Sequence, residues 1–143
     1  MQVRSRQHVA TIEVSGIPHD FDRAEIRFER VVLPRRSFEL RVFIGEPDAT
    51  GDAEVKDNPH YLGSQHFFGV GPGVQGNEPN GSMAADRRQL EPTEIRLNVT
   101  LGLKAFLATG PAGPQPLSLV AVDRGKELFD PGLALEGISL VIT

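Results

Sequence analysis

The stretch His60–Val70, HYLGSQHFFGV, holds the side chains of this sequence whose types and spacing come nearest to suggesting chemistry. His60 and His66 are the one pair of imidazoles that lie close together in the chain. Their even spacing places both on one face of a regular strand, but about 20 Å apart. Ligands of one metal ion must lie within a few ångströms of each other. A metal site therefore requires a bend at Gly63, and the ordinary alternative is a pair of exposed polar histidines.

Two phenylalanines follow, and they suggest contact with a partner. Neighbouring residues of a strand point to opposite faces, so one of Phe67 and Phe68 enters the core and the other faces outward. An outward aromatic ring is a good anchor for another protein. The alternative is that both rings pack inside the fold. The polar loop Gly71–Gln89 comes next, and its length is of the kind often found in functional or disordered loops.

Other motifs argue against catalysis. Gly71–Gly76 (GPGVQG) matches G-x-G-x-x-G in letters, but the residues that follow do not favour the helix that a dinucleotide site requires. The sequence has no G-x-S-x-G nucleophile elbow. It has no cysteine, which excludes thiolate nucleophiles and Cys-ligated zinc. Aspartates scattered over turns are ordinary caps, with a weak calcium site as the alternative. We predict no catalytic residue and no cofactor.

Charge and hydropathy narrow the choice of partners. The net charge is −4 and no block of like charges occurs, whereas nucleic-acid binding needs a basic patch. No apolar run approaches the ~20 residues of a membrane span. Residues 1–20 lack the apolar centre of a signal peptide. We expect a soluble chain with neither nucleic acid nor membrane as a partner, and its compartment stays open.

The elements that must position these residues are mostly short strands. The chain contains 15 glycines and 11 prolines, which favours many turns over long helices. The clearest alternation places Phe38, Leu40, Val42 and Ile44 on one face. Seven segments have strand character: His8–Gly16, Ala24–Leu33, Ser37–Gly45, Tyr61–Val70, Thr93–Val99, Pro116–Asp123 and Ala134–Ile142.

One short helix is predicted near residues 100–109. Thr100 is the expected N-cap, an apolar stripe follows, and Gly110 stands where a C′ glycine belongs. No helix is long enough to connect parallel strands repeatedly, so the sheets should be antiparallel. The sequence therefore predicts one all-β domain over residues 1–143, a mostly antiparallel Greek-key β-sandwich of about seven strands.

Several of these segments follow a known order. Arg41–Pro47 (RVFIGEP) is similar to the pattern R-V-[FY]-[IVL]-x-x-P, and Tyr61–Gly69 (YLGSQHFFG) to [YF]-x-G-[ST]-x-x-[FL]-F-G. Leu97–Leu107 is similar to a strand followed by a short helix with leucine spacing. In these features the chain resembles the C-terminal β domain of tyrosinases and polyphenol oxidases. The K-F-D-V pattern of the plant members is not intact, and Ile26–Glu29 (IRFE) occupies the analogous strand.

The resemblance implies an accessory module rather than an enzyme. The family's enzyme domain holds two coppers with six histidines, and this chain has four. In the family the β domain packs over the copper site, and a tethered cap of this kind acts at high effective concentration. The implied partner is a type-3 copper oxidase domain, in the same polypeptide or in a separate chain. Phe67, Phe68 and the Gly71–Gln89 loop are the candidate plugs, and His60 and His66 would at most touch copper transiently.

Two alternatives remain open. A β-sandwich can serve as a structural or protein-interaction module with no connection to copper enzymes, because the fold alone does not determine function. An enzyme in its own right is the other, and the lack of a convergent set of catalytic side chains argues against it.

Overall fold

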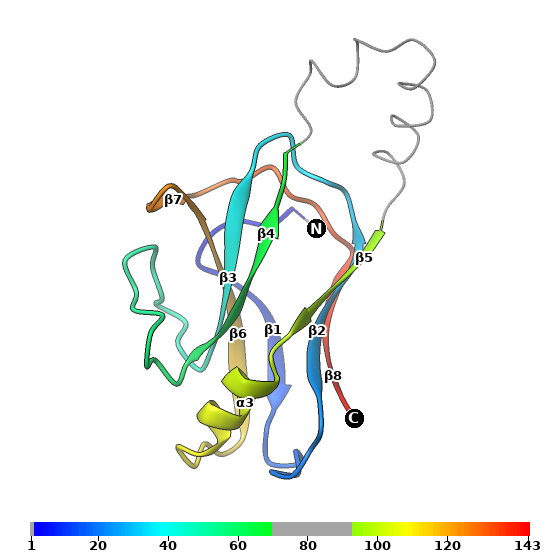
Figure 1. Ribbon diagram of the computed structural model, residues 1–143, viewed down its shortest axis with the longest axis vertical. Helices are drawn as coiled ribbons and strands as arrows, with labels where there is room; N and C mark the ends of the chain where they lie inside the picture. The colour runs from blue at the N-terminus through cyan, green and yellow to red at the C-terminus, as the bar shows by residue number, and fades with distance from the viewer. Residues whose placement is uncertain (1, 70–92) are drawn as a thin grey trace.

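The computed structural model describes residues 2–69 and 93–143, and within them two antiparallel sheets face each other (Figure 1). The larger sheet has the order β1-β6-β3-β4, with β7 paired to β6, and the smaller sheet has the order β5-β2-β8. The strands are β1 (Gln7–Glu13), β2 (Ala24–Val31), β3 (Phe38–Ile44), β4 (Tyr61–Phe67), β5 (Thr93–Asn98), β6 (Pro114–Asp123), β7 (Lys126–Leu128) and β8 (Gly137–Ile142). The predicted all-β sandwich with non-sequential strand order is confirmed.

The core lies between the two sheets and follows the predicted alternation. Phe38, Leu40, Val42 and Ile44 of β3 are all buried in it. The residues of β2 that belong to the core are Ala24, Ile26, Phe28 and Val31, so their spacing changes from two to three after Phe28. The β2–β5 register shifts between Phe28 and Val31, and Arg30 has φ +53°. This irregularity returns Val31 to the core.

A second, smaller cluster lies on the outer face of the larger sheet. Phe43, Val120 and Val122 point away from the main core and are buried with Ala49 of the loop after β3. Ala53, Val55 and Tyr61 pack against the same cluster. The turn-rich segment 46–59, predicted as a loop, therefore covers the sheet as a compact flap, and β6 is buried on both faces.

The helix α3 (Thr100–Leu107) forms where the sequence predicts it, with Leu103, Phe106 and Leu107 buried. The predicted N-cap is wrong: Val99 is the N-cap and makes no side-chain cap bond. The Thr100 hydroxyl instead accepts a hydrogen bond from the Ala24 N–H at 3.0 Å, which ties the helix to β2. Gly110 has φ +78° but lies two residues beyond the C-cap Ala108, one later than predicted.

The sequence prediction of about seven strands misses β7. This three-residue strand follows a two-residue turn in which Arg124 has φ +52° and Gly125 has φ +79°. Two successive positive φ values are the signature of a type I′ hairpin turn. The strand is too short to produce an alternating pattern. Val70 and the loop Gly71–Gln89 lie outside the described residues. Among the residues that are described, no helix has the length and apolar character to cross a membrane.

Candidate functional site

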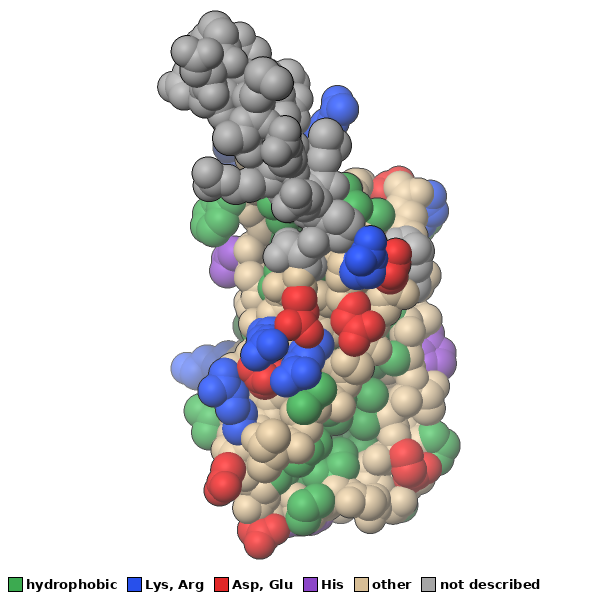
Figure 2. Space-filling view, turned by 90° about the vertical axis from the view of Figure 1, so that its right-hand side faces the viewer, with side chains coloured by type: hydrophobic (Ala, Val, Ile, Leu, Met, Phe, Trp, Pro, Cys, Tyr) green, Lys and Arg blue, Asp and Glu red, His purple; other side chains and the backbone are tan. Residues whose placement is uncertain are grey.

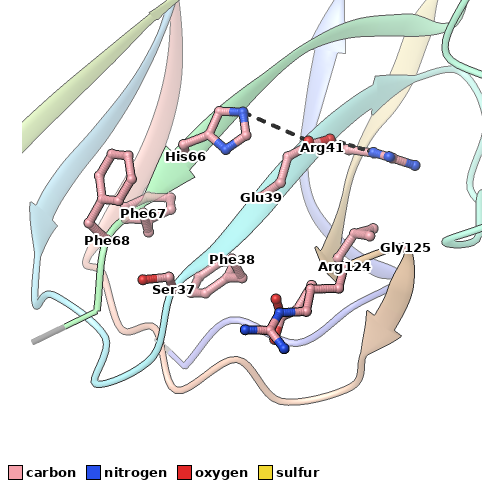
Figure 3. Close-up of a pocket in the computed structure, with 11 residues that line it drawn as sticks. Ser37, Phe38, Glu39, Arg41, His66, Phe67, Phe68, Arg124 and Gly125 are labelled. Atoms are coloured by element: carbon pink, nitrogen blue, oxygen red, sulfur yellow. Dashed lines mark hydrogen bonds and ion pairs between the residues drawn. The ribbon is translucent and has the colours of Figure 1, made fainter. Parts of the chain in front are cut away.

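The end of the larger sheet where β4 finishes carries an open hollow of 320 Å³ (Figure 3). Residues from the start of β3, the end of β4 and the β6–β7 turn line it. Their side chains are mixed in character, with phenylalanines beside two carboxylates, two arginines and an imidazole. The hollow is open to solvent rather than an enclosed cavity.

Phe67 belongs to the core and not to the surface. Its exposed fraction is 3%. The ring stacks on Phe38 with centroids 5.3 Å apart and meets Phe28 edge-on at 6.5 Å. These contacts hold the end of β4 against both sheets. Phe67, one of the predicted plug candidates, could reach a partner only by leaving this packing.

Phe68 is the available ring, with 79% of its surface exposed. The residue after it is fixed: the Gly69 N–H donates to the Ser37 hydroxyl at 2.8 Å. A Cβ atom at Gly69 would overlap the backbone of Arg36, so only glycine allows this close approach. Phe68 is therefore an aromatic ring displayed in water at the end of a rigid strand, between two fixed neighbours. The prediction that the two rings point to opposite sides is confirmed.

Glu39, Arg41, His66 and Asp123 of the hollow lie in ion pairs. Arg41 Nε lies 2.5 Å from Glu39 Oε1, and the Arg41 Nη1 donates to the Gly51 carbonyl at 3.2 Å. His66 Nε2 lies 3.8 Å from the other oxygen of Glu39. Arg36 pairs with Asp123 at 3.1 Å. This arrangement offers no nucleophile next to a base, and it gives the hollow polar groups to one side of Phe68.

The structure does not bring His60 and His66 together. His60 precedes β4, its Nδ1 lies 2.8 Å from the Ile44 carbonyl oxygen, and its ring lies 5.5 Å from that of Phe106. His66 lies at the other end of β4, beside Glu39. The β3–β4 register shifts opposite Gly63, where a bend was considered, but each imidazole keeps its own local partners. Within residues 2–69 and 93–143 no group of three His, Cys, Asp or Glu side chains is placed to hold a metal.

A perturbed carboxyl group lies away from the hollow and has a structural role. Hydrogen bonds from Arg6 at 2.9 and 3.1 Å lower the pKa of Glu127 below its ordinary value. The Gly51 N–H also donates to Glu127, at 2.7 Å, and acts in the same direction. Glu127 thus joins three segments: the entry to β1, the strand β7 and the flap over the outer face.

Sequence reasoning missed the polar partners of the hollow. Glu39 and Arg41 are the outward residues of the strand with the clearest apolar face, so their side of the sheet could be read from the alternation. Their pairing with His66 depends on which strand lies next to β3. No local pattern records that neighbour.

Comparisons with known proteins agree with the fold. No protein-family model and no curated protein matches the sequence. Three solved structures match with TM-scores of 0.57, 0.56 and 0.58: recombinantly expressed latent aurone synthase (polyphenol oxidase), the same enzyme from its natural source, and the recombinant enzyme co-crystallised with hexatungstotellurate(VI) and soaked in H₂O₂. The sequence identities are 12%, 12% and 11%.

Each match covers 99% of this chain and 25% of the other. This chain thus spans a quarter of the length of the polyphenol oxidase that it matches, which is consistent with the C-terminal domain that the sequence motifs suggest. At such low identity the likeness concerns the fold alone. Residues 2–69 and 93–143 therefore have the same fold as one part of a latent polyphenol oxidase, a part that makes up a quarter of its length. This agrees with the resemblance to the C-terminal β domain of tyrosinases and polyphenol oxidases.

Proposed function

We propose that this chain is a non-catalytic accessory module that caps or stabilises a type-3 copper oxidase domain, in the same polypeptide or in a partner chain. The observation that carries the proposal is the fold match, which spans nearly all of this chain and only a quarter of a latent polyphenol oxidase. A quarter-length part is suited to an accessory role. The paired charges of the hollow and the absence of a metal-binding group in the described residues support the same reading.

Within this proposal Phe68 is the side chain that enters the partner. It is exposed, aromatic and held by rigid neighbours, so it loses little conformational entropy on binding. Glu39, Arg41 and His66 line the same hollow as Phe68, to one side of its ring (Figure 3). Protein interfaces commonly combine an apolar anchor, which contributes most of the binding energy, with polar residues at the periphery. His66 would lie at the periphery, and His60 would lie outside the interface.

The test is inhibition of a type-3 copper oxidase domain prepared without its own β domain. The chain is added in increasing amounts and the oxidation of a simple catechol is followed by absorbance. We expect concentration-dependent loss of activity and co-elution of the two proteins. Phe68→Ala should weaken the inhibition roughly tenfold or more, because central aromatic anchors contribute about 2 kcal/mol or more.

Leu101→Ala is the matched control. Leu101 is 84% exposed on α3, at the opposite end of the molecule from the end of β4 (Figure 1). The substitution Leu101→Ala removes an exposed apolar side chain, as Phe68→Ala does, and should leave the inhibition unchanged. A covalent fusion of the two domains tests the tethered form, in which weak contacts suffice. Full activity in both the mixture and the fusion would contradict the proposal and leave the reading as an interaction module unrelated to copper.

A further inference from the structure

The strand β8 lies at the margin of the smaller sheet and pairs only with β2 among the described strands (Figure 1). The Thr143 N–H donates to the Arg23 carbonyl at 2.9 Å, and Arg23 N–H returns a bond at 3.2 Å. In an antiparallel ladder, residues that exchange both backbone hydrogen bonds with the neighbouring strand alternate with residues that exchange none. Counting back from Thr143, the backbone groups of Val141, Ser139 and Gly137 point to β2. The N–H and C=O groups of Ile138, Leu140 and Ile142 therefore point to the open edge.

The other three sheet edges of the described structure are protected. β5 carries the charged pair Glu94 and Arg96, 3.0 Å apart. The start of β4 is covered by α3, which approaches Leu62 closely at Gly102, and the strand continues with the polar residues Ser64, Gln65 and His66. β1 carries Glu13 and an irregular register after His8. Charges, irregularities and covering helices are the usual means of preventing strand addition. The sequence of β8, GISLVI, has no charge and no proline, and its register with β2 is regular.

We propose that β8 pairs antiparallel with β8 of a second copy of this chain, which joins two three-stranded sheets into one of six strands. The open groups fix the register. With Leu140 opposite Leu140 of the second copy, Ile138 faces Ile142 in both directions. All three open residues then form two-way pairs, which gives about six new backbone hydrogen bonds.

The side chains of β8 favour its own copy as the occupant. Ile138, Leu140 and Ile142 are half-buried at the margin of the core and would cover one another across the twofold axis. On the solvent side Ser139 meets Val141 of the second copy, so no like charges face each other. The pairing occupies the open β8 edge of each of the two chains, so association stops at a dimer.

Two lysines on the solvent side of the seam test the proposal. Ser139→Lys and Val141→Lys together place four like charges across the twofold axis. In the single chain, position 141 lies opposite Glu25, which a lysine can pair with, whereas position 139 lies opposite Arg27. Circular dichroism and thermal unfolding of the monomeric variant therefore verify that the fold is retained. In sedimentation equilibrium we expect the wild-type mass to rise from 15.6 kDa towards twice that value with concentration. The double variant should dimerise roughly tenfold or more weakly.

Ala105→Lys with Ala112→Lys is the control, since it adds the same charge at exposed positions away from β8. It should dimerise like the wild type. A mixture of the lysine variant with Ser139→Glu/Val141→Glu should restore dimers by pairing opposite charges. Hydrogen exchange gives a second measure: the amides of 138, 140 and 142 should gain protection with concentration, while those of 139 and 141 stay protected throughout.

A monomer at all concentrations, or a dimer that the lysines leave intact, would overturn the proposal. Protection of the three open amides only after addition of an oxidase domain would assign the edge to that partner and equally exclude the second copy. The proposed dimer does not depend on the proposed capping function. Whether the lysine variant still inhibits a type-3 copper oxidase domain is therefore a separate measurement.

Discussion

At the scale of single residues, Phe67 and Phe68 show how one step along a strand moves an aromatic ring from the core to the surface. Phe67 is enclosed by Phe28 and Phe38, whereas Phe68 meets water. Strand alternation predicts this division from the sequence. It does not predict which ring is inside, because that depends on the phase of β4 relative to β3.

Phe67→Ala should lower the free energy of unfolding by about 3–5 kcal/mol, because it empties a packed aromatic site in the core. Phe68→Ala should change it by less than ~0.5 kcal/mol, as exposed side chains usually do. Urea unfolding followed by circular dichroism measures both values. Equal losses for the two variants would contradict the assignment of Phe67 to the core and Phe68 to the surface.

The ion pair of Glu127 predicts a dependence of stability on pH. Its native pKa lies below the ordinary value of 4.5, so the ionised carboxylate stabilises the fold above about pH 4.5. That contribution is lost as the pH falls through the lowered native pKa. Glu127→Gln removes the charge but keeps an acceptor for the Gly51 N–H.

We therefore expect the melting temperature of wild type to fall more than that of Glu127→Gln between pH 7 and pH 3. The difference between the two proteins should be largest at neutral pH. Glu54→Gln, at an exposed position of the same flap, is the control and should follow the wild type. Parallel curves for wild type and Glu127→Gln would exclude a stabilising role for this pair.

At the scale of elements, the contact between α3 and β4 reverses an ordinary rule. Glycine to alanine within a helix usually stabilises by about 1 kcal/mol. At Gly102 a Cβ atom would lie 2.5 Å from the Leu62 carbonyl oxygen, so the helix would have to move off the strand. Gly102→Ala should therefore destabilise by about 1–3 kcal/mol, as overpacking does.

Ala105→Gly on the same helix is the comparison for Gly102→Ala. Ala105 is exposed, so the change should cost about 1 kcal/mol through helix propensity alone. Denaturant unfolding of both variants measures the difference. Stabilisation by Gly102→Ala would show that helix and strand are not in close contact there.

The elements themselves could largely be predicted from the sequence, and their irregularities could not. Alternation located the longer strands and the helix, since burial of one face imposes the period directly. The uneven spacing of Ile26, Phe28 and Val31 gave a hint of the bulge in β2. The hairpin of β6 and β7 was not predicted, because its turn places Arg124 at a positive φ that arginine does not favour intrinsically.

At the scale of the whole molecule, the composition and strand pattern predicted the sandwich, while the neighbours within each sheet came only from the structure. A period of two tells which residues of β3 face the core, but not that β6 and β4 lie beside it. The hollow at Phe68 depends on those neighbours, so its polar partners were not predictable. The fold match to a latent polyphenol oxidase, at 12% sequence identity, agrees with the resemblance that no single motif establishes.

The place of β6 in the chain has a consequence for how the protein is made. β6 spans residues 114–123, yet it bonds to β1 and β3, which are complete by residue 44. During synthesis those two strands stay unpaired on that side until residues 114–123 have left the ribosome. The larger sheet is therefore completed late, and nascent chains that stall before β6 expose unpaired strand edges to chaperones and proteases.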